Sequence, residues 1–239
     1  SHKKIKPFIE QFSIEMNDFL PEEGRPENDP YPTFNSFFSR RITQTSRPIA
    51  EAPNFPAPCD ARYFAFQNLN DSIPIPVKGS FLKPSALINN EKWNTLFEDG
   101  PGFVARLCPV DYHRFHFPDD GEILDTWRIS GALHSVNPWA LAFRQDIFMI
   151  NERHITILDT VHFGKIAYIE VGATCVGKII QTHQGNSFRR GDEKGMFKFG
   201  GSTVIVLGEK DRWEIDSRIL ENTAQGIESY LKMGQSLGI

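Results

Sequence analysis

The sequence predicts a mainly β (α+β) fold, with a compact β-barrel or sandwich core and peripheral helices. After residue 60 the chain consists largely of short apolar runs that are rich in β-branched and aromatic residues, as strands are. Gly, Pro, Asn or Asp separates most of these runs, which is typical of turns between short strands. Helical spacing of apolar residues is clearest near the two ends of the chain.

The N-terminal part of the chain differs from the rest. Apolar residues recur at helical spacing over 5–20, and a proline ends that pattern. Residues 21–32 are rich in proline and acidic side chains, which favours an exposed linker. Thr33 then has the position and the hydroxyl of an N-cap for a short helix. We therefore expect an N-terminal helical segment and linker over residues 1–45 and a β-rich domain over residues 46–239.

Within the β-rich domain the apolar runs mark the expected strands. They lie at residues 61–66, 73–77, 103–107, 121–129, 155–160, 165–171 and 175–182. Short helical stretches are expected near 85–87 and 93–97. A last helix is expected over 220–233, where apolar residues recur every three or four positions.

The composition excludes several classes of protein. With 40% hydrophobic and 23% charged residues, the chain is globular rather than disordered, and its net charge of −4 argues against a nucleic-acid partner. The cysteines form no Cys-x-x-Cys pair, so no structural zinc site is expected. No run approaches the roughly 20 apolar residues of a membrane-spanning helix. Ser1 and His2 resemble the remnant of a removed tag, so we expect the natural N-terminus to differ.

Ser202 is the first candidate for chemistry. Two glycines precede it, and glycine permits a bent or strained peptide at little steric cost. In such a peptide the serine hydroxyl can attack the preceding carbonyl group, which belongs to Gly201. From these residues alone, a tight turn before a strand remains the simpler interpretation.

Two histidines, His113 and His116, form the second candidate group. They lie between two prolines, so a turn that places both on one face is a reasonable expectation. A histidine with a near-neutral pKa can remove a hydroxyl proton. Asp60, just before a predicted strand, is an acid that can orient such a base. Two structural histidines are the alternative, and a metal site is disfavoured because no further ligand pattern accompanies them.

Many segments, in the same order along the chain, resemble those of the phosphatidylserine decarboxylase family. They are residues 34–41, 47–50, 58–61, 78–79, 111–116, 135–138, 151–153, 163–165, 171–177, 190–193 and 199–203. The last of these has the sequence Phe-Gly-Gly-Ser-Thr, which marks the processing site in one branch of the family. The resemblance extends from about residue 5 to the end of the chain.

This resemblance implies a precursor that cleaves itself between Gly201 and Ser202. The products would be a β chain (1–201) and an α chain (202–239) that begins with a pyruvoyl group derived from Ser202. The pyruvoyl carbonyl serves as the electron sink that pyridoxal phosphate provides in other decarboxylases. We therefore expect a pyruvoyl cofactor, no pyridoxal phosphate and no metal.

The resemblance also assigns roles to the candidate side chains. Asp60, His116 and Ser202 correspond to the family's cleavage triad, with His116 as the base and Asp60 as the group that orients it. His113 corresponds to a position implicated in substrate handling or in protonation during decarboxylation. These roles come from the resemblance and not from the spacing of the residues.

A phospholipid substrate follows from the same resemblance: phosphatidylserine, converted to phosphatidylethanolamine. It implies peripheral contact with a membrane, and a homodimer. Lys78 and Arg106 are candidates for binding the phosphate of the head group. The apolar segments 8–20, 34–38 and 139–143 are candidates for contact with lipid, with core packing as the alternative.

Three other functions stay open on the sequence. A pyruvoyl decarboxylase of a soluble amino acid would carry the same processing motif. A hydrolase that uses Asp60, His116 and Ser202 is disfavoured because the chain has no Gly-x-Ser-x-Gly elbow at the serine. A non-enzymatic β-barrel binding module would leave the chain intact and the segment 111–116 with a structural role alone.

Overall fold

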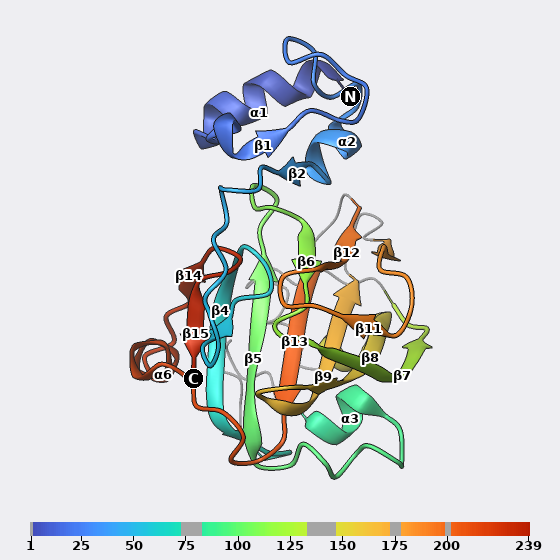
Figure 1. The fold of residues 1–239 in the computed structure, drawn as a ribbon, viewed down its shortest axis with the longest axis vertical. Coiled ribbons are helices and arrows are strands. Elements are labelled where there is room, and N and C mark those ends of the chain that lie inside the picture. Colours follow the sequence, from blue (N-terminus) through green and yellow to red (C-terminus); the bar gives the residue numbers. More distant parts are fainter. Residues whose placement is uncertain (1, 73–82, 133–146, 173–177, 199–201) are drawn as a thin grey trace.

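The computed structural model describes residues 2–72, 83–132, 147–172, 178–198 and 202–239 (Figure 1). Strands dominate these ranges and the helices are short and peripheral, which confirms the mainly β prediction. The longest helices in the described part of the chain have 8 residues, and none there is long and apolar enough to cross a membrane. The expected strand at 73–77 lies outside the described residues.

One large antiparallel sheet organises the fold. Its order is β11 (Ser187–Phe188), β7 (Gly121–Ile129), β8 (Arg153–Thr160), β9 (Gly164–Gly172), β13 (Ser202–Gly208), β5 (Gly100–Leu107), β4 (Ala61–Leu69) and β14 (Ser229–Leu231). β13 is central, and its first residue, Ser202, pairs with Leu107 of β5 on one side and Gly172 of β9 on the other. Strand β13 is an unbroken buried run, as expected of a strand covered on both faces.

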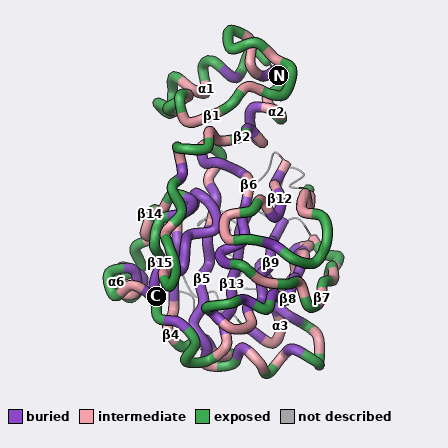
Figure 2. The backbone as a smooth tube through the Cα atoms, in the orientation of Figure 1, coloured by how far each residue is buried: buried purple, intermediate pink, exposed green. Residues whose placement is uncertain are grey.

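Two hydrophobic clusters lie on opposite faces of this sheet. Val204 and Val206 of β13 belong to the first cluster, and Ile205 and Leu207 to the second, as the two-residue period of a strand requires. Figure 2 shows the buried run through β5, β13 and β9 at the centre of the molecule. The central position of β13 therefore places Ser202 deep in the protein.

Smaller elements cover the two faces. On the first face lie the strand pair β3 (Phe55–Pro56) with β15 (Ser236–Gly238), helix α6 (Ser217–Ala224), and the three-stranded sheet β10 (Ile179–Gln181), β12 (Glu193–Phe197) and β6 (Arg114–His116). On the second face lie α3 (Pro84–Ile88), the turns around Trp93 and Phe97, and α5 (Ile147–Ile150). The sheet β10-β12-β6 brings the histidine segment to the same face as the first cluster.

The N-terminal segment lies at one end of the sheet and has a hydrophobic cluster of its own (Figure 1). It contains η1 (His2–Lys4), α1 (Ile5–Phe12), η2 (Met16–Asp18), β1 (Phe19–Leu20), α2 (Phe34–Phe38) and β2 (Arg41–Ile42). Its cluster is built on Ile5, Tyr31 and Phe37. The boundary at residue 45 stays a prediction.

The first predicted helix is shorter than expected. It ends at Phe12 because Ser13 adopts a left-handed conformation (φ 50°), and the N–H groups of Ser13 and Ile14 close the helix by donating to the carbonyls of Glu10 and Ile9. The apolar spacing beyond residue 13 instead serves a 3₁₀ turn and strand β1. The spacing of apolar residues alone cannot predict such a cap.

The last predicted helix is also partly wrong. Helix α6 ends at Ala224, and Gly226 takes a positive φ of 72°, a conformation that glycine adopts readily. The following residues, Ser229–Leu231, pair with the edge of β4. Residues 93–97 form consecutive turns instead of a helix, and only Ile179–Gln181 of the expected strand 175–182 is described as a strand.

Thr33 caps helix α2 as the sequence predicts. Its Oγ1 accepts a hydrogen bond from Ser36 N at 3.0 Å, and Ser36 Oγ accepts one from Thr33 N at 3.2 Å. Thr33→Ala is expected to lower the free energy of unfolding by about 1 kcal/mol, because an orphan N–H loses its acceptor. Urea denaturation measures this, with Thr33→Ser as the control that keeps the hydroxyl. Equal stability of the alanine variant would contradict a stabilising cap.

Candidate active site

Ser202 is fully buried at the start of β13. The β-branched run that follows it favours an extended strand. Because Val204 and Val206 face the first cluster, the period of two places the Ser202 side chain on that same face. The hydroxyl therefore points toward the sheet β10-β12-β6 and the segment that leads into β6.

His113 meets Ser202 directly. Its Nε2 lies 3.0 Å from the carbonyl oxygen of Cys108, and its Nδ1 lies 3.1 Å from Ser202 Oγ. A carbonyl oxygen can only accept, so Nε2 carries the proton and donates it. Nδ1 is then left with a lone pair that accepts from the Ser202 hydroxyl. This arrangement is that of a base and the hydroxyl it deprotonates.

The charge state of His113 agrees with that role. Burial, assisted by the positive charge of Arg40, lowers the pKa of His113 to about 3. The imidazole is therefore neutral at physiological pH and keeps the lone pair on Nδ1. Its ring also stacks on Phe38, with centroids 3.7 Å apart and planes 21° apart.

His116 has different partners. Its Nδ1 lies 2.9 Å from the carbonyl oxygen of Gly191 and must donate to it, so the Nε2 lone pair accepts from the hydroxyl of Tyr112 at 3.0 Å. Burial lowers the pKa of His116 as well. Its lone pair is thus occupied by Tyr112, whereas the lone pair of His113 faces Ser202.

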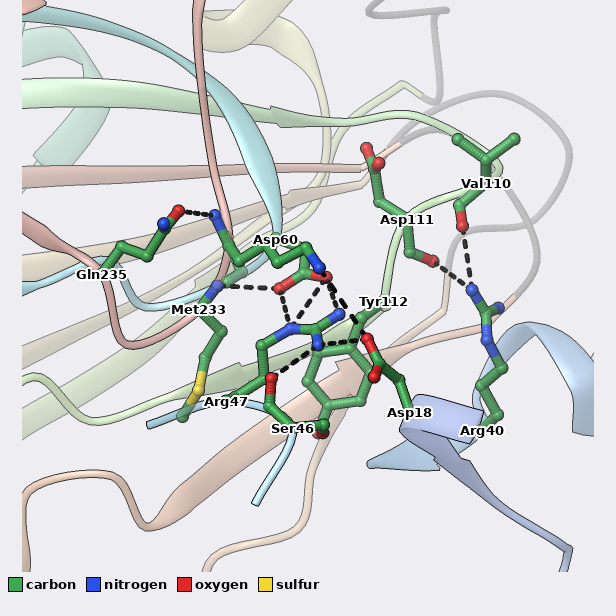
Figure 3. A network of polar contacts seen from close by, with 12 residues as sticks. Asp18, Arg40, Ser46, Arg47, Asp60, Val110, Asp111, Tyr112, Met233 and Gln235 are labelled. Atoms are coloured by element: carbon green, nitrogen blue, oxygen red, sulfur yellow. Dashed lines mark hydrogen bonds and ion pairs between the residues drawn. The ribbon is translucent and has the colours of Figure 1, made fainter. Parts of the chain in front are cut away.

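Asp60 is tied to Arg47. Arg47 donates from Nε to Asp60 Oδ1 at 2.9 Å and from Nη2 to Oδ2 at 2.6 Å, and the N–H of Met233 donates to Oδ1 at 2.7 Å (Figure 3). Arg47 also donates from Nη1 to Asp18 at 2.8 Å. These contacts join the carboxylate to the N-terminal segment and to the C-terminal turn. The tautomer of His116 is set by Gly191 and not by Asp60.

The structure describes only one of the two candidate head-group residues. Arg106 donates from Nε and Nη2 to the two carboxylate oxygens of Glu228, at 2.8 and 2.6 Å, so its charge is already paired. Lys78 lies outside the described residues, as do Gly201 and the segment 139–143. Of the other apolar candidates, Phe37 and Phe38 are buried and Phe12 is about half exposed.

Four partners of the histidines were not predicted: the Tyr112 hydroxyl, the Cys108 and Gly191 carbonyls, and the Phe38 ring. Tyr112 belongs to the same motif as the histidines, and a signal for it was present in the sequence. The Cys108 carbonyl and Phe38 carried no signal, because a main-chain acceptor and a stacking ring depend on the tertiary fold. Within the described ranges no three His, Cys, Asp or Glu side chains gather as they would around a metal.

Comparisons with known proteins show the family of the chain. The family model described as phosphatidylserine decarboxylase matches residues 34–239. The phosphatidylserine decarboxylase proenzymes of Clostridium perfringens and Clostridium botulinum are 42% and 43% identical to this chain, over 100% of the chain and 80% of each relative. That of Clostridium novyi is 41% identical with the same coverage. The chain therefore belongs to the phosphatidylserine decarboxylase family, whose members are carboxy-lyases.

Proposed function

We propose that this chain is a precursor that cleaves itself before Ser202 and then converts phosphatidylserine to phosphatidylethanolamine with a pyruvoyl group at that position. The contact between Ser202 Oγ and His113 Nδ1, at 3.1 Å, is the observation that carries the proposal. It pairs a buried hydroxyl with a neutral base at the motif where the family is processed. The word proenzyme in the names of the relatives supports a processed product.

The cleavage uses only groups of the chain and water. The Ser202 hydroxyl loses its proton and Oγ bonds to the carbonyl carbon of Gly201, while the C–N bond breaks and the nitrogen of residue 202 takes up a proton. The resulting ester then loses the α-proton of residue 202, and the Cβ–Oγ bond breaks. Gly201 leaves as a carboxylate, and residue 202 becomes dehydroalanine. Water converts the dehydroalanine to the pyruvoyl group and releases ammonia.

The geometry favours His113 as the group that takes the hydroxyl proton. The resemblance assigns this step to His116, with Asp60 as its partner. In the structure, however, the Nε2 lone pair of His116 accepts from Tyr112, and it would have to give up that contact before it could serve Ser202. We therefore assign the first proton transfer to His113 and treat the triad of Asp60, His116 and Ser202 as the competing assignment.

The surroundings of residue 202 fit a pyruvoyl group. A pyruvoyl group needs no more room than serine, because its keto oxygen takes the place of the nitrogen and Oγ is lost, and Ser202 and His113 are both fully buried, away from bulk water. The pyruvoyl carbonyl supplies an electron sink for the electron pair that remains when carbon dioxide departs. His113 would keep Nδ1 directed at residue 202 after cleavage and could hold or deliver a proton there.

A lipid substrate implies an approach at a membrane surface, and we propose peripheral contact for that reason. A homodimer is proposed on the resemblance alone. Turnover on phosphatidylserine vesicles, compared with free serine and other amino acids, separates the lipid enzyme from a decarboxylase of soluble amino acids.

Intact mass of the denatured protein tests the proposed cleavage. We expect two chains, 1–201 and 202–239, with an N-terminus on the second that resists Edman degradation and reacts with a hydrazide. Ser202→Ala is expected to give one intact and inactive chain, because the nucleophile is gone. A wild-type chain that stays whole, or an alanine variant that is still cut at this bond, would refute the mechanism.

A further inference from the structure

We propose that Phe38 and Arg40 of the N-terminal segment are positioning residues, which hold His113 so that its Nδ1 meets residue 202. The proposal rests on the function above in one respect, namely that His113 serves residue 202. Under this proposal the N-terminal segment contributes to the chemistry, although that segment lies outside the large sheet.

Phe38 fixes the plane of the His113 ring. It is the last residue of α2 and is buried, and it stacks on the imidazole at 3.7 Å between centroids. An imidazole held only by its hydrogen bond to the Cys108 carbonyl could still tilt about that bond. The stack removes this freedom, since tilting would drive the ring into Phe38. Two constraints thus direct the Nδ1 lone pair at Ser202.

Arg40 fixes the backbone that carries His113. Its Nη2 donates to the carbonyl oxygens of Val110 and Asp111, at 2.9 and 3.3 Å (Figure 3). These residues belong to the same turn as Cys108, whose carbonyl accepts from the N–H of Asp111 at 2.9 Å and also from His113 Nε2. Arg40 therefore holds the turn that supplies the acceptor for the histidine.

A second arginine ties the two segments together from the other side of His113. Arg114 donates from Nε and Nη2 to the carbonyl oxygen of Ser39, at 3.0 and 2.8 Å. Ser39 lies between Phe38 and Arg40. The stretch 38–40 and the stretch 110–114 are consequently clamped at several points, with the imidazole in between.

Packing alone is a poor explanation for Arg40. Its side chain is only 2% exposed, its guanidinium lies over the rings of Phe19 and Phe37, and its hydrogen-bond acceptors in Figure 3 are main-chain carbonyl oxygens. Burial lowers the pKa of Arg40 to about 10, which reports the cost of placing a cation there. A neutral side chain of similar volume would avoid that cost.

A conservative substitution separates a positioning role of Arg40 from a structural one. Lysine keeps a cation that can donate to the carbonyl oxygens of Val110 and Asp111, whereas methionine keeps much of the volume and loses the donor. Among the described residues, the groups that act on the imidazole are Arg40, the Ser202 hydroxyl, the Cys108 carbonyl and the Phe38 ring, while the Asp111 carboxylate pairs with Arg62 at 2.8 Å. Burial is the main cause of the low pKa of His113 and Arg40 adds to it, so removing Arg40 leaves the larger cause in place.

The experiment compares Phe38→Leu, Arg40→Met and Arg40→Lys in the full chain, with His113→Gln as the reference. The cleavage rate of freshly translated precursor and the turnover of processed protein are both measured from pH 5 to pH 8, together with melting temperatures. Phe188→Leu and Arg41→Met are the matched controls. Phe188 is a buried ring that stacks on Phe117 at 4.0 Å instead of on His113, and Arg41 is an exposed cation next to Arg40.

Whichever step His113→Gln impairs, we expect Phe38→Leu and Arg40→Met to slow it as well. The expected loss is about tenfold for each variant, which corresponds to about 1.4 kcal/mol in the barrier. Arg40→Met should slow this step by the same factor at pH 5 and at pH 8, because burial still keeps His113 neutral, and Arg40→Lys should restore the wild-type rate. The controls should match the wild type in rate and profile.

Two results would overturn the proposal. The first leaves the proposed function intact, and the second also removes the assignment of His113. If His113→Gln slows a step but Phe38→Leu and Arg40→Met do not, or if the controls slow it equally, the positioning role is wrong and the proposed function stands. If His113→Gln changes neither cleavage nor turnover, the assignment of His113 falls and the positioning role falls with it.

Discussion

His113→Gln is expected to slow cleavage before Ser202 by about two to four orders of magnitude, the usual contribution of a general base. Glutamine can keep a donor for the Cys108 carbonyl, which His113 Nε2 now contacts at 3.0 Å. It has no basic nitrogen to place 3.1 Å from the Ser202 hydroxyl. The substitution therefore removes the proton acceptor while leaving much of the packing. Conversion of precursor to two chains, followed by mass spectrometry over time, gives the rate.

His116→Gln is the matched control for this prediction. It removes the basic nitrogen of His116, which now accepts from the Tyr112 hydroxyl, and leaves the contact between His113 and Ser202 in place. We expect cleavage within about tenfold of the wild-type rate, equivalent to at most about 1.4 kcal/mol in the barrier. A block in His116→Gln together with normal cleavage in His113→Gln would instead establish the triad of Asp60, His116 and Ser202.

Lys194→Met is expected to lower the free energy of unfolding by about 3–5 kcal/mol, because it strands a buried carboxylate. Lys194 Nζ lies 2.7 Å from Glu170 Oε1 and 2.9 Å from Gln181 Oε1, and both charged side chains are almost fully buried. Burial favours the neutral form of Glu170, but the charge of Lys194 and a hydrogen bond with His154 outweigh it and lower its pKa. Urea denaturation measures the loss.

The double variant Glu170→Gln/Lys194→Met is the control, since removing both charges together is often nearly neutral. The sign of the pH effect gives a second check. In Lys194→Met the carboxylate of Glu170 can be neutralised by a proton, so the loss of stability relative to wild type should shrink as the pH falls. A single variant as stable as wild type at pH 7 would show that the ion pair contributes no net stability.

Much of the sheet could be predicted from the sequence because its strands carry a local signal. The run 121–129 alternates between partly buried and exposed residues along its whole length, and it forms β7 with the predicted bounds. The helix ends could not be predicted in the same way. Ser13 and Gly226 end helical patterns through positive φ angles, and the pairing of Ser229–Leu231 with β4 depends on a strand far away in the sequence.

The same distinction between local and tertiary information applies to the candidate site. Ser202, His113 and His116 could be named because their residue types and neighbours form recognisable patterns. Which histidine faces the serine could not be predicted, because the answer lies in which carbonyl orients each ring. The Cys108 carbonyl leaves Nδ1 of His113 free for Ser202, whereas the Gly191 carbonyl leaves Nε2 of His116 for Tyr112. No sequence pattern encodes the position of a main-chain oxygen.

The central position of β13 would have a consequence for a protein cleaved as proposed. Ser202 pairs with β5 and β9 at once, and the strands that follow, β14 and β15, pair with β4 and β3. A chain cut before Ser202 would thus be a heterodimer in which both parts contribute to the two hydrophobic clusters of the large sheet. Its unfolding releases two molecules that must find each other again, so its melting temperature should depend on protein concentration, as mass action requires. The uncut precursor folds as a single molecule and is exempt from this dependence, which favours folding first and cutting afterwards.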